Sequence, residues 1–193
     1  MPRVLVTPPA AEPLTLATVK AHLRLTDDAG AEDALLNVLI SAAREWAEDQ
    51  TRRALITQTW QETFDRFPPC EIRLGLTPVQ EITKVSYVDA SGAAVDLAAA
   101  QYIVDAASLP ARVRRAYGVS WPSTRDQANA VSVEFTAGYG DAPDDVPAAI
   151  RMAMLLVVGD LYANREAQIV GTIVAENPTA KALIGPYRVR EAV

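Results

Sequence analysis

The chain has few of the side chains on which enzymes and metal sites depend. Among its 193 residues it has one histidine, His22, and one cysteine, Cys70. A single cysteine cannot form an internal disulfide, and one Cys with one His cannot complete a zinc site. The GxSxG, HExxH, CxxC and P-loop motifs are also absent. These absences weigh against an enzyme with a known motif and against a zinc protein.

Positive charge is scarce as well. The chain has 18 Lys and Arg against 24 Asp and Glu, a net charge of -6, and no run of basic residues. This balance argues against tight binding to a nucleic acid backbone, although an acidic wall that lets DNA pass remains compatible. The apolar run at residues 152–158 is far short of the roughly twenty residues that a membrane span needs. We therefore expect no membrane segment, and a location in a cytoplasm or in a particle assembled there.

A few small features remain as candidates for chemistry. The carboxylate pairs Asp27/Asp28 and Asp144/Asp145 precede predicted helices, where capping explains them, but a metal or acid/base role stays open. Residues 138–140 form a glycine-bearing turn that lacks the third glycine of a dinucleotide site. Trp121, in the long connection over residues 105–129, either plugs the β region or anchors a neighbouring subunit.

Capping and apolar spacing predict helices near both ends of the chain. Thr15 is an N-cap for a short helix, and a long amphipathic helix follows from about residue 28 to 53. A third helix is expected from Pro147 to Glu166. Its residues 152–158 are apolar on every side, which favours cover by a neighbouring subunit. We expect the two long helices to pack together and to bury Leu36, Leu39, Trp46, Met154, Val157 and Leu161.

Between these helices the sequence is typical of β-structure. Residues 56–64 are rich in β-branched and aromatic side chains, and residues 131–137 alternate strictly between apolar and polar. A turn at residues 89–92 separates two further strands. Shorter strands are expected at residues 71–74, 82–88, 94–97, 102–104 and 112–115. The opening segment, with Pro8, Pro9 and Pro13, is expected to be extended and mobile.

These elements predict an α+β fold: a helical bundle with an inserted antiparallel β module and an extended C-terminal arm. We expect one domain over residues 1–167, with its helical core at 14–53 and 146–167 and the β module at 54–141. The arm comprises residues 168–193.

The order of several short motifs resembles the head–tail connector (adaptor) family of long-tailed double-stranded DNA phages, prophages and gene transfer agents. Each motif is weak alone, but together they recur in order along nearly the whole chain. The resemblance lies in residues 16, 20–24, 33–35, 42–44, 53–60, 78–79, 87–89, 92, 121–122, 137–140, 146–147, 164–166 and 182–188.

This resemblance implies a non-enzymatic ring protein, usually of twelve copies, at the virion head–tail interface, assembled in the host cytoplasm without cofactors. Its implied partners are other copies of the chain, the portal protein, and a stopper or tail-completion protein. Double-stranded DNA would pass through the channel without sequence-specific binding. A small enzyme or a nucleic-acid-binding accessory protein remains the alternative, and convergence of Asp27, Asp28, Asp144 and His22 would favour the enzyme.

The C-terminal arm is the expected docking segment to the portal. Its apolar residues have no partner that the sequence identifies, and ordering them in water costs about 1 to 2 kcal/mol of backbone entropy per residue. Arginine and tyrosine are also frequent anchors of interfaces. The candidate contact residues are Ile173, Val174, Leu183, Ile184, Tyr187, Arg188 and Arg190.

Overall fold

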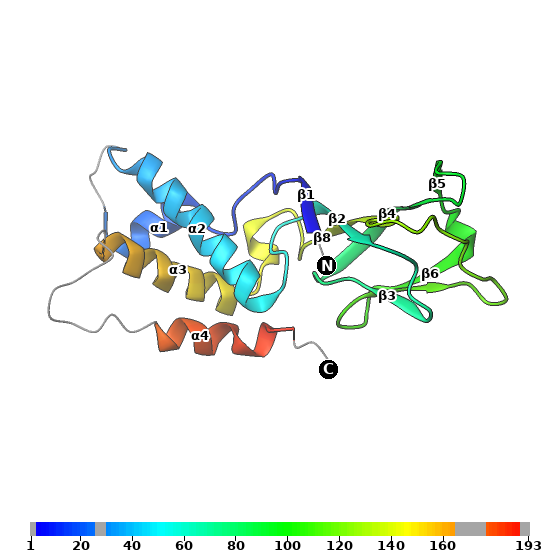
Figure 1. Cartoon of the computed structure of the whole chain (residues 1–193). Coiled ribbons are helices and arrows are strands. Elements are labelled where there is room, and N and C mark those ends of the chain that lie inside the picture. Colours follow the sequence, from blue (N-terminus) through cyan, green and yellow to red (C-terminus); the bar gives the residue numbers. More distant parts are fainter. Residues whose placement is uncertain (1–2, 26–29, 165–176, 190–193) are drawn as a thin grey trace, which may run out of the picture. The chain divides into compact units, whose positions relative to one another are not determined.

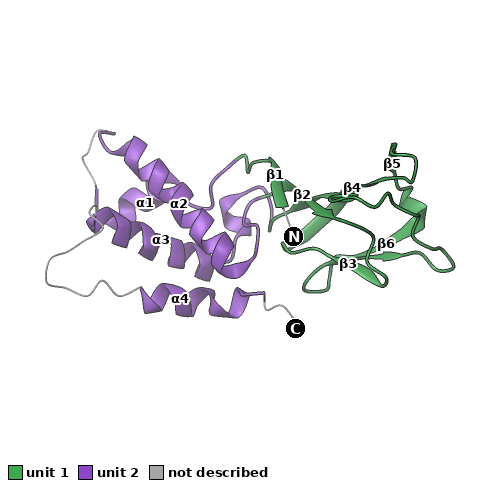
Figure 2. Cartoon of the chain, viewed as in Figure 1, with its two compact units in different colours: residues 1–10, 57–139, 191–193 green, residues 11–56, 140–190 purple. Residues whose placement is uncertain are grey.

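A computed structural model of the protein describes residues 3–25, 30–164 and 177–189. The chain forms two compact units (Figure 2). Unit 1 comprises residues 1–10, 57–139 and 191–193, and unit 2 comprises residues 11–56 and 140–190. Unit 1 carries the β-structure and unit 2 the α-helices, so the predicted α+β class is confirmed.

Two antiparallel sheets form in the part of unit 1 that the structure describes. The first has five strands in the order β1-β2-β8-β4-β5, and the second has three in the order β3-β7-β6. The strands, labelled in part in Figure 1, are β1 (Arg3–Thr7), β2 (Gln58–Phe64), β3 (Glu71–Arg73), β4 (Val79–Val88), β5 (Ala94–Asp96), β6 (Tyr102–Asp105), β7 (Arg112–Arg115) and β8 (Val131–Ala137). A short 3₁₀ helix, η1 (Ala99–Gln101), precedes β6.

The alternating sequence of β8 places it at the centre of the larger sheet. β8 pairs with β2 on one side and with β4 on the other. Its apolar residues Val131, Val133, Phe135 and Ala137 are all buried, while the polar residues between them are half-buried. Alternate side chains of a β-strand point to the same face, and in β8 the apolar face lies in the core. The prediction for residues 131–137 is confirmed.

The turn between β4 and β5 follows its sequence signal. The Asp89 carboxylate accepts hydrogen bonds from the backbone N–H of Ser91 and of Ala93, at 2.8 and 3.0 Å. Gly92 adopts φ +95°, a left-handed conformation that a residue without Cβ enters at little cost. The Ser91 hydroxyl and these backbone donors hold the pKa of the Asp89 carboxyl below its usual range.

The opening segment is a strand with a defined partner. β1 pairs antiparallel with β2, with Leu5 opposite Trp60. The guanidinium of Arg3 lies 5.1 Å from the centre of the Trp60 ring, a cation–π distance. The expectation that this segment is mobile is therefore wrong for residues 3–7, because the hydrogen-bonding edge of β2 is available to it.

The described residues of unit 2 form four α-helices and two 3₁₀ helices. They are α1 (Leu16–Leu23), α2 (Asp33–Thr51), η2 (Pro143–Asp145), α3 (Ala148–Ala163), α4 (Pro178–Ile184) and η3 (Gly185–Tyr187). The side chain of Thr15 accepts a hydrogen bond from the backbone N–H of Thr18, which confirms the predicted N-cap. None of the helices in the described ranges is long and apolar enough to cross a membrane.

α2 and α3 pack against each other as predicted, but they bury fewer residues than expected. Leu36 and Met154 are buried, whereas Leu39, Trp46 and Val157 are only half-buried. Leu161 is 40% exposed, so the expectation that it is buried is wrong. The buried residues of α3 are Ile150, Ala153, Met154 and Val158, which recur at helical spacing on one side. α1, α2 and α4 therefore leave part of the apolar surface of α3 uncovered.

Candidate functional site

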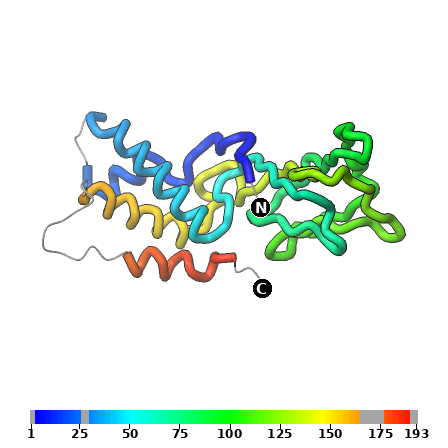
Figure 3. The backbone as a smooth tube through the Cα atoms, in the orientation of Figure 1, coloured from blue at the N-terminus to red at the C-terminus, as the bar shows by residue number. Residues whose placement is uncertain are grey.

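The C-terminal segment lies against the helices of its own unit. α4 packs along α3, from which it is distant in sequence (Figure 3). Ala180 and Ile184 of α4 are buried. Beyond α4, Arg53 Nε donates to the carbonyl oxygen of Tyr187 at 2.6 Å, and the N–H of Val189 donates to the carbonyl of Thr51 at 3.0 Å. The expectation that this part of the arm has no internal partner is therefore wrong.

The candidate contact residues of the arm fall into three groups. Ile173, Val174 and Arg190 lie outside the described residues. Ile184 is 4% exposed and belongs to the core of unit 2, so its side chain anchors α4 and is not presented to a partner. Leu183 and Tyr187 are half-buried and Arg188 is exposed, and these three remain on the surface.

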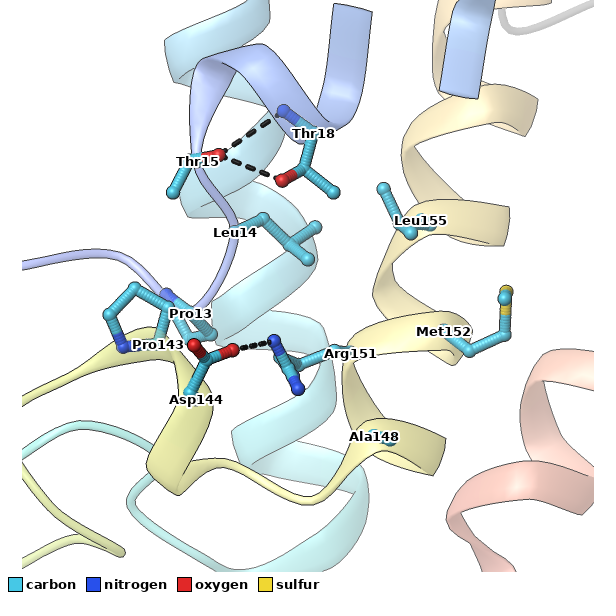
Figure 4. Close-up of a pocket in the computed structure, with 10 residues that line it drawn as sticks. All are labelled: Pro13, Leu14, Thr15, Thr18, Pro143, Asp144, Ala148, Arg151, Met152 and Leu155. Carbon is cyan, nitrogen blue, oxygen red and sulfur yellow. Dashed lines mark hydrogen bonds and ion pairs between the residues drawn. The ribbon is translucent and has the colours of Figure 1, made fainter. Parts of the chain in front are cut away.

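Unit 2 also has a groove beside the N-terminal half of α3 (Figure 4). Its volume is about 370 Å³, and its lining is largely apolar. The lining residues are Pro13, Leu14, Thr15, Thr18, Pro143, Asp144, Ala148, Arg151, Met152 and Leu155. Arg151 Nη1 binds the Asp144 carboxylate at 2.5 Å, and the hydroxyls of Thr15 and Thr18 bind each other at 2.8 Å. The groove suits an apolar side chain and offers no free nucleophile.

Of the residues considered for enzyme chemistry, the structure describes Asp144 and His22, and it does not bring these two together. Asp144 is held by Arg151, and the Asp145 carboxylate accepts the N–H of Ala142 at the start of η2. No side chain caps α3, so neither carboxylate caps that helix. His22 lies beside Gly159 of α3. Arg151, which binds Asp144, and Gly159, which lies beside His22, are about 12 Å apart along α3, since each helical residue rises 1.5 Å. Asp144 and His22 therefore lie at different places along this helix. Among the described residues, no three His, Cys, Asp or Glu side chains are grouped as a metal site would require. Asp27 and Asp28 lie outside the described ranges.

An ion-pair cluster in unit 2 joins the segment before α1 to α2. Arg44 Nε binds Glu12 at 2.9 Å, and Arg44 Nη1 binds Glu48 at 3.0 Å. The side chains of Arg44 and Glu48 are each only 12% exposed. Burial alone would lower the pKa of Arg44, but the charges of Glu48 and Glu12 outweigh it and raise the pKa. Apolar spacing places Arg44 and Glu48 opposite the core face of this helix, where exposure is expected, but the ion-pair cluster leaves both side chains little exposed.

Replacing Arg44 with methionine is expected to lower the free energy of unfolding by about 1 to 3 kcal/mol. The methionine keeps the volume but leaves Glu12 and Glu48 facing each other without their shared cation. Urea unfolding monitored by circular dichroism measures the change. Glu45→Gln serves as the control, because Glu45 is 72% exposed and its loss should change stability by no more than about 0.5 kcal/mol. Equal losses in the two variants would contradict the role given to Arg44.

Glu62 is a buried carboxylate in β2 of unit 1. It is 2% exposed and accepts the N–H of Gly75 with both oxygens, at 3.0 and 3.1 Å. Arg3 Nη1 lies 3.8 Å from Glu62 Oε1. Burial raises the pKa of the Glu62 carboxyl, and the bond from Gly75 and the charge of Arg3 oppose this only in part.

The raised pKa of Glu62 predicts a pH-dependent stability. Because the folded state holds the Glu62 proton more tightly than the unfolded state, the free energy of unfolding falls as pH rises from the ordinary glutamate range through the folded pKa. Glu62→Gln should remove this decrease, since the amide oxygen still accepts from Gly75 but carries no charge. Urea unfolding at a series of pH values tests the prediction. Identical pH profiles for the variant and the original chain would contradict it.

The smaller sheet of unit 1 carries a cluster of arginines that we call the basic face. It consists of Arg73, Arg112 and Arg114 around Glu71, together with Ile103. One carboxylate serves three cations: Glu71 lies 2.9 Å from Arg73, 3.7 Å from Arg112 and 3.6 Å from Arg114. Hydrogen bonding from Arg73, with the charges of Arg112 and Arg114, lowers the pKa of the Glu71 carboxyl against a smaller effect of burial.

The basic face is positioned by strand register. Arg114 lies opposite Glu71 on one side and opposite Ile103 on the other. Val113 and Ile72, which point to the opposite side of the sheet, are buried. The sequence predicts the strand at residues 112–115, but the candidate contact residues did not include its arginines. The signal was present, because Arg112 and Arg114 are two residues apart and must share a face.

The alternatives left open for Trp121 are decided by its contacts in unit 1. The Trp121 ring stacks on Phe67 with a centroid distance of 4.8 Å and an interplanar angle of 6°. Phe67 in turn meets the edge of Tyr87 at 5.7 Å. Trp121 therefore packs against the β module of its own subunit, as the first of the two alternatives predicts.

The chain is similar to a known family and to solved structures. The family of phage gp6-like head–tail connector proteins matches residues 13–117. A chain in the neck of an empty gene transfer agent particle, computed with C6 symmetry, is 27% identical with a TM-score of 0.83. A chain of the virion of a native gene transfer agent particle is 26% identical with a TM-score of 0.82.

The similarity extends over the full length of both chains. In each of these two pairs the match covers 100% of this chain and 98% of the other. A third chain, from the neck of a native gene transfer agent particle computed with C12 symmetry, has the same fold at 22% identity and a TM-score of 0.78. No curated protein sequence matches the chain significantly.

Proposed function

This chain belongs to the phage gp6-like head–tail connector family, and we propose that it is a subunit of the neck of a phage-like particle. The observation that carries the proposal is the similarity over the whole chain to a subunit of a gene transfer agent neck, at 27% identity. The proposed role is structural and not enzymatic.

The finer proposal is a ring of twelve copies beneath the portal. The ring would extend the DNA channel and present a platform for a stopper or tail-completion protein. The C6 symmetry of the similar neck is compatible with a ring of six or twelve copies of one chain. Uncovered apolar residues on α3, such as Met152 at 47% exposure, also fit a protein whose surface is partly covered in an assembly.

Electron microscopy of portal-bearing particles tests this function. Particles made with the protein should show a ring on the portal axis, and particles made without it should lack that density. A reconstruction without imposed symmetry counts the copies. Density away from the portal axis would contradict the connector role, and a count other than twelve would correct only the stoichiometry.

The isolated protein is expected to bind duplex DNA weakly. Its net charge of -6 makes the average field repulsive to phosphates, so DNA should pass without being held. We expect a dissociation constant weaker than about 1 µM at physiological salt, measured by fluorescence anisotropy with a labelled duplex. Tighter binding would favour the alternative of a nucleic-acid-binding accessory protein.

We also propose that the arm over residues 168–193 docks the subunit to the portal. Its sequence supports this role through Ile173, Val174 and Arg190, which lie outside the described residues, and through the surface residues Leu183, Tyr187 and Arg188. Arg188→Glu should reduce incorporation into portal-bearing particles without loss of stability. Arg24→Glu makes the same charge change on another exposed arginine and should be incorporated normally. Equal incorporation of both variants would argue against a portal contact at Arg188.

A further inference from the structure

One exposed stripe of α2 has chemistry complementary to the basic face of unit 1. We call it the α2 stripe, and its exposed residues are Ala34, Leu35, Val38, Ala42, Glu45 and Asp49. Because an α-helix turns by about 100° per residue, these six residues fall within an arc of roughly 100° on the helix surface. The stripe is apolar in the first half of the helix and acidic in the second half.

The apolar half of the stripe is open to solvent. Val38 is 64% exposed and Leu35 is 36% exposed, with the small residues Ala34 and Ala42 beside them. Small side chains next to an exposed valine let another surface approach closely. Such a patch on a helix otherwise packed in a core indicates contact with a second protein surface.

Within the residues that the structure describes, the acidic half of the stripe is only weakly compensated. Glu45 is 72% exposed, and its ion-pair partner, Arg44 at 3.7 Å, already binds Glu12 and Glu48 more closely. Within the described part of the chain, Asp49 has no ion-pair partner. The last turn of α2 has no basic residue, and Arg52 follows it as the C-cap.

The basic face has the opposite imbalance. Arg73 and Arg114 are 53% and 61% exposed although they share Glu71 with Arg112, so positive charge remains for a partner. Ile103, opposite Arg114 in the register, is 57% exposed. An exposed aliphatic residue beside arginines is the composition found at the energetic centres of protein interfaces.

We propose that the basic face of one subunit docks on the α2 stripe of a neighbouring copy of the same chain. Arg112 and Arg114 would meet Glu45 and Asp49, and Ile103 would lie against Val38. This inference rests on the proposed ring and names the two surfaces that join its subunits.

The charges also select the kind of symmetry. Two basic faces repel each other, as do two acidic stripes, so a closed dimer through either surface is disfavoured. A contact between two different surfaces is heterologous, and repeated around an axis it gives a ring when the rotation closes. The proposed contact therefore favours a ring over an isolated dimer.

A charge exchange between the two surfaces tests the proposal. One variant carries Arg112→Glu and Arg114→Glu, and the other carries Glu45→Arg and Asp49→Arg. Each alone should raise the concentration needed for assembly by at least about tenfold, because like charges then face each other. An equimolar mixture should assemble again, since each altered surface meets its complement on the other variant. Mass photometry and sedimentation velocity on the full chain measure both effects.

Controls separate folding from assembly. Arg66→Glu with Lys84→Glu makes the same charge change at exposed positions of unit 1 outside the basic face and should assemble normally. Circular dichroism checks the fold of each variant. If the Arg112/Arg114 variant does not fold because Glu71 is left among acids, the α2 variant tests the same contact from the other side.

The outcomes distinguish this inference from the proposed function. If the original chain assembles only on particles, the same variants are compared by their occupancy in the neck. A ring that forms equally well with the α2 variant overturns the contact but leaves the connector function intact. Failure of the original chain to form a ring in solution and on particles overturns the proposed function, and this inference with it.

Discussion

Replacing Phe135 with alanine is expected to lower the free energy of unfolding by about 3 to 5 kcal/mol. Phe135 is fully buried in β8, the central strand of the larger sheet, opposite Trp60 of β2 and Ile82 of β4. Strands on both sides hold the backbone of β8, so the sheet cannot collapse into the cavity that the lost ring leaves. The large expected loss follows from the cavity as well as from the lost burial.

Thermal and urea unfolding measure the effect of Phe135→Ala. Tyr117→Ala provides the control in the same unit, because Tyr117 is fully exposed and its removal should change stability by no more than about 0.5 kcal/mol. A loss below about 1 kcal/mol for Phe135→Ala would show that β8 does not form the centre of the core.

Removal of residues 177–193 is expected to lower the free energy of unfolding by about 2 to 4 kcal/mol. The truncated chain loses the burial of Ala180 and Ile184 and the hydrogen bonds of Arg53 and Thr51 to the segment after α4. The gain in chain entropy offsets part of this loss. The packing of α4 on α3 is the reason to expect this loss.

A point variant tests the same contact without shortening the chain. Ile184→Asp places a charge at a side chain that is 4% exposed, and its largest possible effect is to detach α4 from the rest of unit 2. The decrease in the free energy of unfolding should therefore approach the decrease caused by truncation and should not exceed it. Arg188→Glu, on the exposed surface, should leave stability unchanged. A stable Ile184→Asp variant would show that α4 does not contribute to the core of unit 2.

These variants also determine how a docking experiment must be designed. Truncation of the arm changes both stability and the proposed portal contact, so failure to join particles would have two explanations. Surface changes such as Arg188→Glu separate the two effects, because they alter only the exposed part of the segment.

Local signals in the sequence were sufficient for most secondary structure. The turn at Asp89 and the N-cap at Thr15 are formed by neighbours within a few positions, and the alternation in residues 131–137 can be recognised within a single strand. Local chemistry of this kind is the same before and after the chain folds, which is why it can be predicted without a structure.

The failures share one cause, which is a partner far away in sequence. β1 is a strand because β2 offers it an edge, although the two are more than fifty positions apart. Arg44 is covered because Glu12 reaches it, and Ile184 is buried because α3 lies beside it. No periodicity within a short window contains that information.

The α+β class, the order of most helices and strands and the resemblance to the family could be predicted from the amino-acid sequence, because these depend on local patterns and on motifs in a fixed order; β1 was the exception. Only the tertiary structure decided which exposed residues remain available for assembly. Burial depends on contacts between distant segments, and those contacts removed Ile184 from the candidate surface while leaving the basic face and the α2 stripe open.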